Sequence, residues 1–219
     1  MIINILTSQT LFSATSWSIS QLLPKENIKL NSDFKFIKLK ELVRERHKEK
    51  GNDESEYINY IGLENIESKT GRLINFEMKK KESIKSGFKT FFKGDILFGR
   101  LRPNLNKIYL NNQFDIGGCT TEIIVLQPNS QIVDSIYLVE LLRTEKINKQ
   151  IVNLIKGAAL PRVNINDLLE MEIPLPNLEL QTKISREIIK KRQELEELYK
   201  KIKLIPEEID DLYSCSYAS

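Results

Sequence analysis

The stretch LELQTKISREIIKKRQELEELYKKIKLI, residues 178–205, contains neither glycine nor proline and predicts one uninterrupted helix. At about 1.5 Å per residue, such a helix is roughly 42 Å long. Its apolar residues recur in alternating steps of four and three, which is typical of a coiled-coil seam if a lysine takes one seam position. The predicted dimer or partner seam consists of Ile184, Ile188, Lys191, Leu195, Leu198, Ile202 and Ile205.

A helix with one apolar stripe has to cover that stripe, and two coverings are open. The length of the helix beyond a small domain favours a partner helix. The alternative is that the helix packs back on its own domain, as most amphipathic helices do. A lysine in a seam costs stability but can fix register and orientation, so Lys191 is a candidate for a specifying role if a partner helix is present.

Upstream of this helix, the sequence from about residue 35 to residue 128 consists of short apolar runs that are separated by polar turns and glycines. This spacing is typical of strands in a mainly β domain. The predicted strand-bearing runs are KFIKL (35–39), YINYIGL (57–63), GRLINFEM (71–78), GDILFGRL (94–101), NKIYL (106–110) and GGCTTEIIVLQP (117–128).

Between the strands and the long helix, the apolar period becomes helical over residues 134–155. The pattern predicts one helix there, capped by Asp134 and ended by Gly157. Asn166 is expected to cap a very short helical turn, and the prolines of EIPLP (172–176) force an extended exit. The fold class is therefore α+β: a mixed, β-rich domain followed by a long C-terminal coiled-coil helix.

The composition limits the class of protein. Of the 219 residues, 41% are hydrophobic and 29% are charged, so the chain can bury a core. No apolar run approaches the roughly 18 residues of a spanning helix, and the first residues lack the charged leader of a secretory signal. Cys119, Cys215 and the single His47 cannot form a zinc cage or a disulfide framework. We expect a cytoplasmic protein with no membrane partner.

The charge is unevenly distributed. The whole chain has a formal net charge of only +3, but residues 79–107 carry nine lysines and arginines against Glu82 and Asp95. A cluster of this kind repels itself and is most easily tolerated where a polyanion neutralises it, which is how phosphate-binding surfaces look in sequence. A lysine-rich solvated face explains the same cluster equally well.

Nothing in the sequence indicates a catalytic centre. No glycine-rich phosphate loop of the dinucleotide or P-loop type follows a strand, and no motif for holding a flipped base is present. His47 lies in the charged stretch RERHKEK and is expected at the surface. Glu77 and Lys79 form the tail of a nuclease pattern, but its upstream acid is missing because Asp53 lies in a predicted loop. Cys119 is expected to be a small buried residue.

Six stretches, in the order in which they occur, resemble the signature blocks of one family, the DNA-specificity subunits of type I restriction-modification systems. The resemblance covers about residues 33–205, and several ordered blocks are far more specific than one motif. The six stretches are YIGLENI (60–66), TGRL (70–73), IKSGFKTFFKGD (84–95), ILFGRLRPNLNK (96–107), CTTEIIVL (119–126) and LPRVNINDLLEMEIPLPNLELQ (160–181).

The resemblance implies a target-recognition domain followed by a long conserved helix. A full-length subunit of this family has two such halves, whose helices pack antiparallel as a spacer and whose domains each read one part of a split DNA target. The subunit itself is not catalytic and holds no cofactor. It recruits methylation subunits, which use S-adenosylmethionine to methylate adenine, and the restriction complex adds a motor-nuclease subunit.

By this resemblance we expect three segments: a leader of uncertain structure (1–30), a DNA target-recognition domain (31–176), and a helix with a C-terminal tail (177–219). The sequence contains one half of the family's pattern, so we hypothesise that two copies associate through residues 178–205 and read a palindromic split target. Pairing with another half, a truncated or silent half, and a protein-only coiled-coil adaptor are the alternatives. A stand-alone nuclease or methyltransferase would need a motif that the sequence lacks.

Candidate DNA contacts follow from both lines of reasoning. The lysines of residues 79–93 are expected to contact phosphates, while the residues of RLRPNLNK (100–107) position backbone or shape the domain. Arg162 could contact DNA or a methylation subunit, or serve a structural turn. Base readers are expected in the loops around 67–81 or 111–115. The candidates are Lys79, Lys80, Lys81, Lys85, Lys89, Lys93, Arg100, Arg102, Asn104, Lys107 and Arg162.

Overall fold

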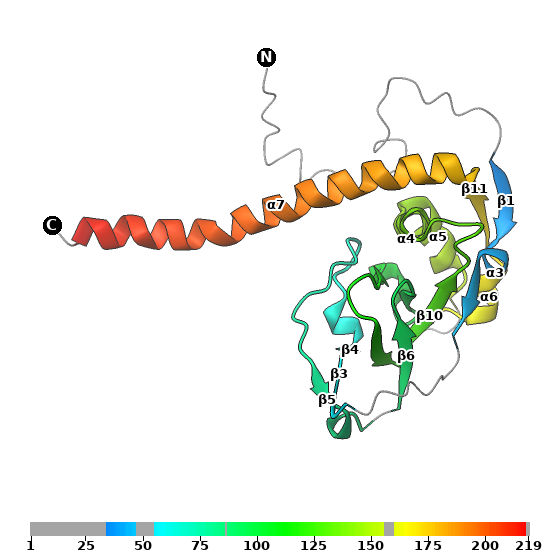
Figure 1. Ribbon diagram of the computed structural model, residues 1–219, viewed down its shortest axis with the longest axis horizontal. Helices are drawn as coiled ribbons and strands as arrows, with labels where there is room; N and C mark the ends of the chain where they lie inside the picture. Colours follow the sequence, from blue (N-terminus) through cyan, green and yellow to red (C-terminus); the bar gives the residue numbers. More distant parts are fainter. Residues whose placement is uncertain (1–33, 47–54, 86, 156–159, 218–219) are drawn as a thin grey trace, which may run out of the picture.

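The computed structural model describes residues 34–46, 55–85, 87–155 and 160–217, with side chains as far as residue 213. It consists of a β-rich body and one long helix, which crosses the body at one side and projects far beyond it (Figure 1). This arrangement confirms the predicted fold class. The predicted leader (1–30), His47, Asp53 and Gly157 lie outside the described residues.

The described residues of the body form four small sheets. The largest is antiparallel, with the strand order β2-β10-β7-β8, and the next has the order β4-β9-β6, in which β4 and β9 are parallel. The two remaining sheets each pair two antiparallel strands, β1 with β11 and β3 with β5. The strands are β1 (Lys35–Lys38), β2 (Val43–Glu45), β3 (Tyr57–Ile58), β4 (Tyr60–Ile61), β5 (Lys79–Lys80), β6 (Phe88–Phe92), β7 (Ile96–Gly99), β8 (Ile108–Leu110), β9 (Ile116–Thr120), β10 (Ile123–Pro128) and β11 (Glu172–Leu175).

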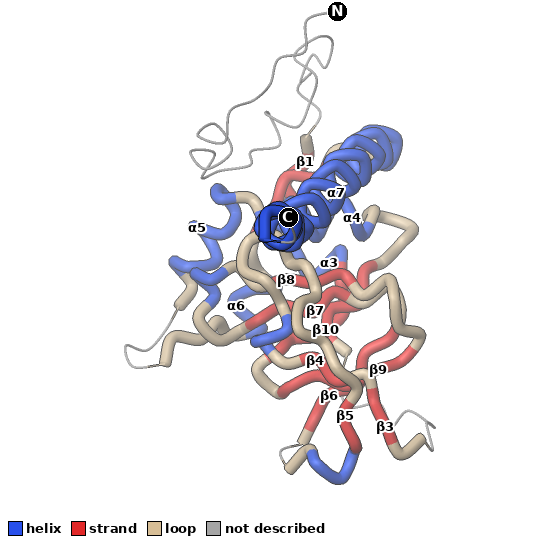
Figure 2. Tube along the Cα trace, turned by 90° about the vertical axis from the view of Figure 1, so that its left-hand side faces the viewer, coloured by secondary structure: helices blue, strands red, loops and turns tan. Residues whose placement is uncertain are grey.

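The largest sheet separates two apolar clusters. Side chains alternate along a strand, so Ile124 and Leu126 of β10 face one cluster while Ile123 and Val125 face the other. A strand that is buried on both faces reads as a continuous apolar run, which explains the sequence of β10. Figure 2 shows the resulting order: α7 and its neighbour α4 on one side, the sheet of β10, β7 and β8 next, and β3 and β5 at the opposite end.

The α-helices share one of the two apolar clusters, and among the shorter ones α4 packs against α7. Short 3-10 turns lie between some of the strands in the described part of the chain. The α-helices are α3 (Leu39–Leu42), α4 (Ser135–Arg143), α5 (Glu145–Asn153), α6 (Ile165–Leu169) and α7 (Leu178–Tyr217), and the 3-10 turns are η1 (Leu63–Asn65), η2 (Lys81–Ser83) and η3 (Pro103–Leu105).

Five of the six predicted runs contain strands, and the prediction for GRLINFEM (71–78) is wrong. Within this region there is only an isolated bridge between Ile66 and Leu73, and the two-residue strand β5 follows it. The backbone reverses at Gly71 and Asn75, whose φ values are 64° and 48°. Two left-handed residues so close together interrupt any extended segment.

The predicted single helix over 134–155 is two helices, α4 and α5. Asp134 caps the first as predicted: its Oδ1 accepts hydrogen bonds from the backbone N–H groups of Ile136 (2.9 Å) and Tyr137 (3.0 Å). The helix is interrupted at Thr144, which has an extended ψ of 146°. Its hydroxyl donates a hydrogen bond to the Leu141 carbonyl. A side-chain bond of this kind offers the backbone an alternative to continuing the helix.

Two boundaries further along also differ in part from the prediction. The cap of α6 is Asn164, whose Oδ1 accepts from Asn166 N at 2.8 Å, so Asn166 itself lies inside the helix. The extended exit through EIPLP is confirmed as β11. The long helix begins at Leu178, but it runs through Pro206 to Tyr217 and not only to residue 205. A proline removes one backbone donor, and the exposed helix continues on both sides of it.

Candidate nucleic-acid interface and helix junction

The predicted cations divide between two places in the fold. The first group lies on β5, η2 and β6 and in the adjoining turns, and Figure 1 places β5 at the end of the body opposite α7. We call it the β5–β6 surface, and it comprises Lys79, Lys80, Lys81, Lys85, Lys89 and Lys93. The second group consists of Arg100, Arg102, Asn104 and Lys107 with Arg162, and we call it the Arg100 segment. A bridge between Leu101 and Arg162 joins its two parts.

On the β5–β6 surface, folding places carboxylates from outside residues 79–107 next to the lysines. The paired side chains are largely exposed in most cases, as for Lys80 (53%) and Glu56 (60%). An exposed ion pair contributes only about 0–1 kcal/mol, so a phosphate can replace the carboxylate at little cost. The pairs are Lys79 with Glu64 (4.0 Å), Lys80 with Glu56 (3.0 Å), Lys89 with Glu45 (3.7 Å) and Lys93 with Asp115 (3.7 Å).

Two tyrosines lie beside these lysines. The ammonium nitrogen of Lys79 is 4.6 Å from the centre of the Tyr60 ring, and that of Lys80 is 5.5 Å from the centre of the Tyr57 ring. Both tyrosines are strand residues, on β4 and β3. Tyr57 is 41% exposed, so the surface presents a ring as well as cations to solvent. The rings hold the lysine amines in place by cation–π attraction.

The backbone of the Arg100 segment is tied to its neighbours on both sides. Arg100 N donates to the Glu122 carbonyl (2.9 Å), and Arg102 N donates to the Pro161 carbonyl (2.8 Å). Arg102 and Asn106 are both left-handed, with φ values of 49° and 52°, and they bracket the turn η3. The ammonium group of Lys107 donates to the Leu63 carbonyl at 2.7 Å. These contacts support the expectation that this block shapes the domain.

Arg162 is paired with Glu122 through a two-pronged contact. Its Nε and Nη2 atoms donate to the carboxylate at 2.9 and 2.8 Å. These hydrogen bonds lower the pKa of Glu122, and the charge of Arg100 lowers it further. The Nε atom of Arg100 is buried and has no hydrogen-bond partner among the described residues, whereas Arg102 and Asn104 are exposed. The segment therefore offers Arg102 and Asn104 to solvent and holds Lys107 and Arg162 in internal contacts.

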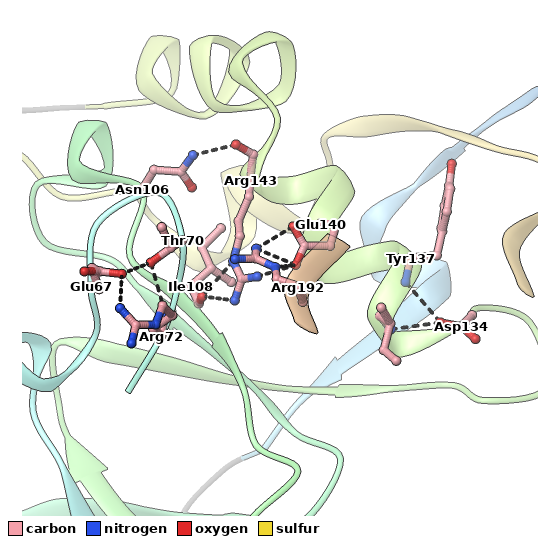
Figure 3. A network of polar contacts seen from close by, with 11 residues as sticks. Glu67, Thr70, Arg72, Asn106, Ile108, Asp134, Tyr137, Glu140, Arg143 and Arg192 are labelled. Carbon is pink, nitrogen blue, oxygen red and sulfur yellow. Dashed lines mark hydrogen bonds and ion pairs between the residues drawn. The ribbon is translucent and has the colours of Figure 1, made fainter. Parts of the chain in front are cut away.

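Sequence reasoning missed a polar junction between the body and α7 (Figure 3). Glu140 of α4 accepts hydrogen bonds from Arg143, one turn along the same helix, and from Arg192 of α7, both at 2.6 Å. Burial lowers the pKa of Arg143 to about 10, and its Nη2 donates to the Ile108 carbonyl at 2.5 Å. The spacing of Glu140 and Arg143 was the one signal in the sequence, because Arg192 is distant along the chain.

The body covers the apolar stripe in the first half of α7, which is the second of the two predicted coverings. Ile184 and Ile188 are 2% and 4% exposed, and they pack into the core of the chain's own body. The prediction of a partner seam is therefore wrong for these two residues, since the body already covers them. Lys191 is exposed and pairs with Glu194 (2.8 Å), and Leu195 is half-buried.

Beyond Leu195, the apolar stripe faces solvent. The exposed fractions are 41% for Leu198, 61% for Ile202 and 48% for Ile205. The alternation of four and three continues through Ile209 and Leu212, which are also exposed, so the stripe is longer than predicted and passes Pro206. We call residues 198–213 the distal half of α7 and residues 178–195 the proximal half.

The described ranges also bear on metal binding, membrane insertion and thiol chemistry. Within them, no group of histidine, cysteine, aspartate or glutamate side chains could hold a metal ion. None of the helices in the same ranges is long and apolar enough to cross a membrane. Cys119 is fully buried, as predicted, and burial raises the pKa of its thiol to about 12.

The chain is similar to known specificity proteins along most of its length. The family described as type I restriction modification DNA specificity domain matches residues 31–205. Two curated relatives from Escherichia coli are each 28% identical: the EcoDI specificity subunit over 135 residues (61% of this chain and 29% of the relative) and the EcoAI specificity subunit over 140 residues (60% and 23%). The chain thus spans less than a third of the length of these relatives.

Solved structures have the same fold. The HsdS subunit from Thermoanaerobacter tengcongensis superimposes with a TM-score of 0.65 at 24% identity, covering 80% of this chain and 46% of that one. The S subunit from M. genitalium gives a TM-score of 0.54 at 18% identity, covering 83% and 45%. Because the family match extends over residues 31–205, this chain belongs to the specificity subunits of type I restriction-modification systems.

Proposed function

We propose that this chain recognises a DNA sequence for a type I restriction-modification complex, with its body reading one half of a split target. The observation that carries the proposal is the division of the molecule. Exposed lysines lie on β5, which Figure 1 places at the end of the body opposite α7, and the projecting distal half of α7 has an exposed apolar stripe. The first feature suits a polyanion and the second suits a protein partner.

The β5–β6 surface would supply affinity that does not depend on sequence. Exposed carboxylates pair with Lys79, Lys80 and Lys93, and phosphates can replace these partners. We expect the residues that read bases to lie in nearby loops. Within the expected range 67–81, Arg72 is engaged with Glu196 of α7, so we do not count it among the base readers. Asn112 and Gln113 in the second expected range are exposed amides of the type that can pair with adenine.

The distal half of α7 would join this chain to a second helix. Its stripe, from Leu198 to Leu212, has the spacing of a coiled-coil seam and is exposed. A second copy of this chain would make a symmetric pair with two identical recognition domains. Another half-subunit would make an asymmetric pair. In either assembly, methylation subunits carrying S-adenosylmethionine would do the chemistry, and a motor-nuclease subunit would join for restriction.

The DNA proposal is tested with a random duplex pool and the full chain. We expect selection of one short sequence, with affinity falling steeply as salt rises. K79A/K80A should weaken binding about equally for all sequences and reduce the salt slope by roughly one per lost phosphate contact. The matched control is K146A, because Lys146 is an exposed lysine on α5 away from this surface. Absent binding, or binding insensitive to salt, would favour the protein-only adaptor.

The assembly proposal is tested by mapping methylated adenines in cells that express the chain with a methylation subunit of its own system. Cells lacking the chain are the control. A new split palindrome would support a pair of identical copies, because identical domains read identical half-sites in opposite orientation. A split but asymmetric motif would support pairing with another half. No new motif would favour a silent half.

A further inference from the structure

The body contacts α7 through polar side chains at three successive positions along the helix. Over the first turns, Gln181 and Ser185 are buried and bond to the cap residue Asp134, with Ser185 donating to its carboxylate at 2.7 Å. One level on, Arg192 bonds to Glu140. At the third level, Arg72 reaches Glu196 of α7 from the loop of residues 67–73.

The guanidinium of Arg72 has a partner on each side. Its Nε donates to Glu196 Oε1 at 2.6 Å, its Nη1 is 3.6 Å from Glu67, and its Cζ is 3.7 Å from the centre of the Tyr199 ring. Glu196 and Tyr199 are three positions apart and share one face of the helix. A planar fork that pairs with a carboxylate and stacks on a ring is the particular capacity of arginine, which lysine lacks.

The loop that carries Arg72 is itself seated on the polar junction. Gly71 has a φ of 64°, and a Cβ at this position would lie 2.0 Å from Arg143 Nη2 and from the Ile108 carbonyl oxygen. The loop is also tied by Lys69 N, which donates to the Asn106 carbonyl at 3.0 Å. Arg72 therefore projects from a backbone with a fixed position.

The position of the Arg72 contact along α7 lets it affect the direction of the rest of the helix. From Tyr199 to Tyr217 the helix rises about 27 Å, so a tilt of about 10° at Tyr199 would move its end by about 5 Å. As far as residue 213, the apolar side chains along this length are largely exposed, as for Ile202 and Leu212. The direction of the distal half therefore depends on how firmly the turns up to Tyr199 are held.

We propose that Arg72 is a positioning residue, which clamps Glu196 and Tyr199 to the loop 67–73 and so sets the angle between the recognition domain and the distal half of α7. The consequence rests on the proposed function. In a pair of chains joined through their distal halves, this angle sets the separation and relative orientation of the two recognition domains. Arg72 would therefore determine which spacing between two half-sites is bound.

The clamp is tested first without DNA, in the full chain. Spin labels at S130C on the body and E207C on the helix, in a C215S background, report one distance; Cys119 is fully buried and is left in place. Labelled chain is diluted with unlabelled chain so that distances within one copy dominate. We expect a narrow distribution for the unsubstituted chain, a broadened or shifted one for R72A, and an intermediate one for R72K.

The control is K201A, which removes an exposed cation two residues beyond Tyr199 and should leave the distribution unchanged. Circular dichroism checks that each variant is folded. If R72A does not fold, E196Q/Y199L removes the same contact from the helix side and should broaden the distribution likewise. A distribution in R72A, or in E196Q/Y199L, that matches the unsubstituted chain would overturn the clamp.

The second readout uses duplexes with two half-sites at different separations. We expect R72A to lose several-fold of the preference for one separation over its neighbours, while its affinity for a single half-site is unchanged. An unchanged spacing preference in R72A would overturn the proposed role in spacing. If the unsubstituted chain binds no specific sequence but R72A still alters the label distance, the proposed DNA function fails and the clamp stands.

Discussion

The two halves of α7 carry the same apolar pattern and have different surroundings. In the proximal half, Ile184 and Ile188 lie in the core of the body, with less than 5% of either side chain exposed. In the distal half, Ile202 and Ile205 occupy equivalent seam positions and are 61% and 48% exposed. The comparison shows that a periodic apolar stripe predicts a covered helix face. It does not specify whether the chain's own body or a partner helix covers that face.

The polar residues of the helix mark the same division. Gln181 and Ser185 are buried in the proximal half, and their side chains bond to Asp134 at the start of α4. Lys191 faces solvent near the end of this half and pairs only weakly, through an exposed contact with Glu194. A partner helix can therefore approach the distal half without displacing part of the body.

The largest expected effect separates the two halves by folding. I184D/I188D would place two charges in the core, and we expect a loss of more than about 4 kcal/mol of unfolding free energy, enough to abolish cooperative folding. I202D/I205D changes the same seam in the distal half and should leave the urea midpoint of the isolated chain nearly unchanged. Equal losses in both variants would contradict the division.

The second prediction concerns assembly. L198E/I202E/I205E should weaken self-association by at least about a hundredfold in dissociation constant, because like charges would face each other across the seam. Light scattering after size exclusion measures the mass. K200E/K203E, which adds negative charge to the distal half outside the predicted seam, is the control and should retain the mass. An assembly whose mass does not fall in the triple variant is not held by the distal half.

A smaller effect is expected at the boundary between the halves. R192A removes one of the two cations on Glu140, and Arg143 remains as its partner. Because the pair is only partly exposed, we expect a loss of about 1–2 kcal/mol in thermal or urea unfolding. R186A changes an exposed arginine of the same helix and should cost less than about 0.5 kcal/mol. If R186A lowers the unfolding free energy as much as R192A does, the contact with Glu140 contributes no particular stability.

The smallest expected effect is at Lys191. Its pair with Glu194 is exposed, so K191A should change the unfolding free energy of the isolated chain by less than about 0.5 kcal/mol. K190A, which disrupts the similar exposed pair with Glu187, is the matched control. A change in assembled mass for K191A alone would support the predicted specifying role of Lys191, and a large loss of chain stability would contradict its placement at the surface.

Much of the local structure was predictable because it depends on neighbouring residues. Asp134 caps α4 through its own side chain, and the prolines of EIPLP extend the chain whatever surrounds them. The errors fall where a local pattern was ambiguous. GRLINFEM has an apolar composition typical of a strand, but it adopts left-handed turns at Gly71 and Asn75 and seats its loop on Arg143.

The charged residues show the same limit. The excess of lysines in residues 79–107 is visible in the sequence, but the carboxylates of Glu45, Glu56 and Glu64 reach them only after folding. The Glu140 and Arg192 contact joins α4 to α7, and no spacing along the chain reveals it. Arg72 looked like part of a candidate reading loop, and its partners on α7 give it a different position.

The sequence by itself determined the β-rich character of the domain, the long amphipathic helix and the family, because these depend on periodicity, capping and ordered blocks of residues. Only the tertiary structure decided which half of the helix the body covers, which lysines have carboxylate partners and where Arg72 points. Those outcomes depend on contacts between residues that are distant along the chain, and such contacts form only when packing brings the elements together.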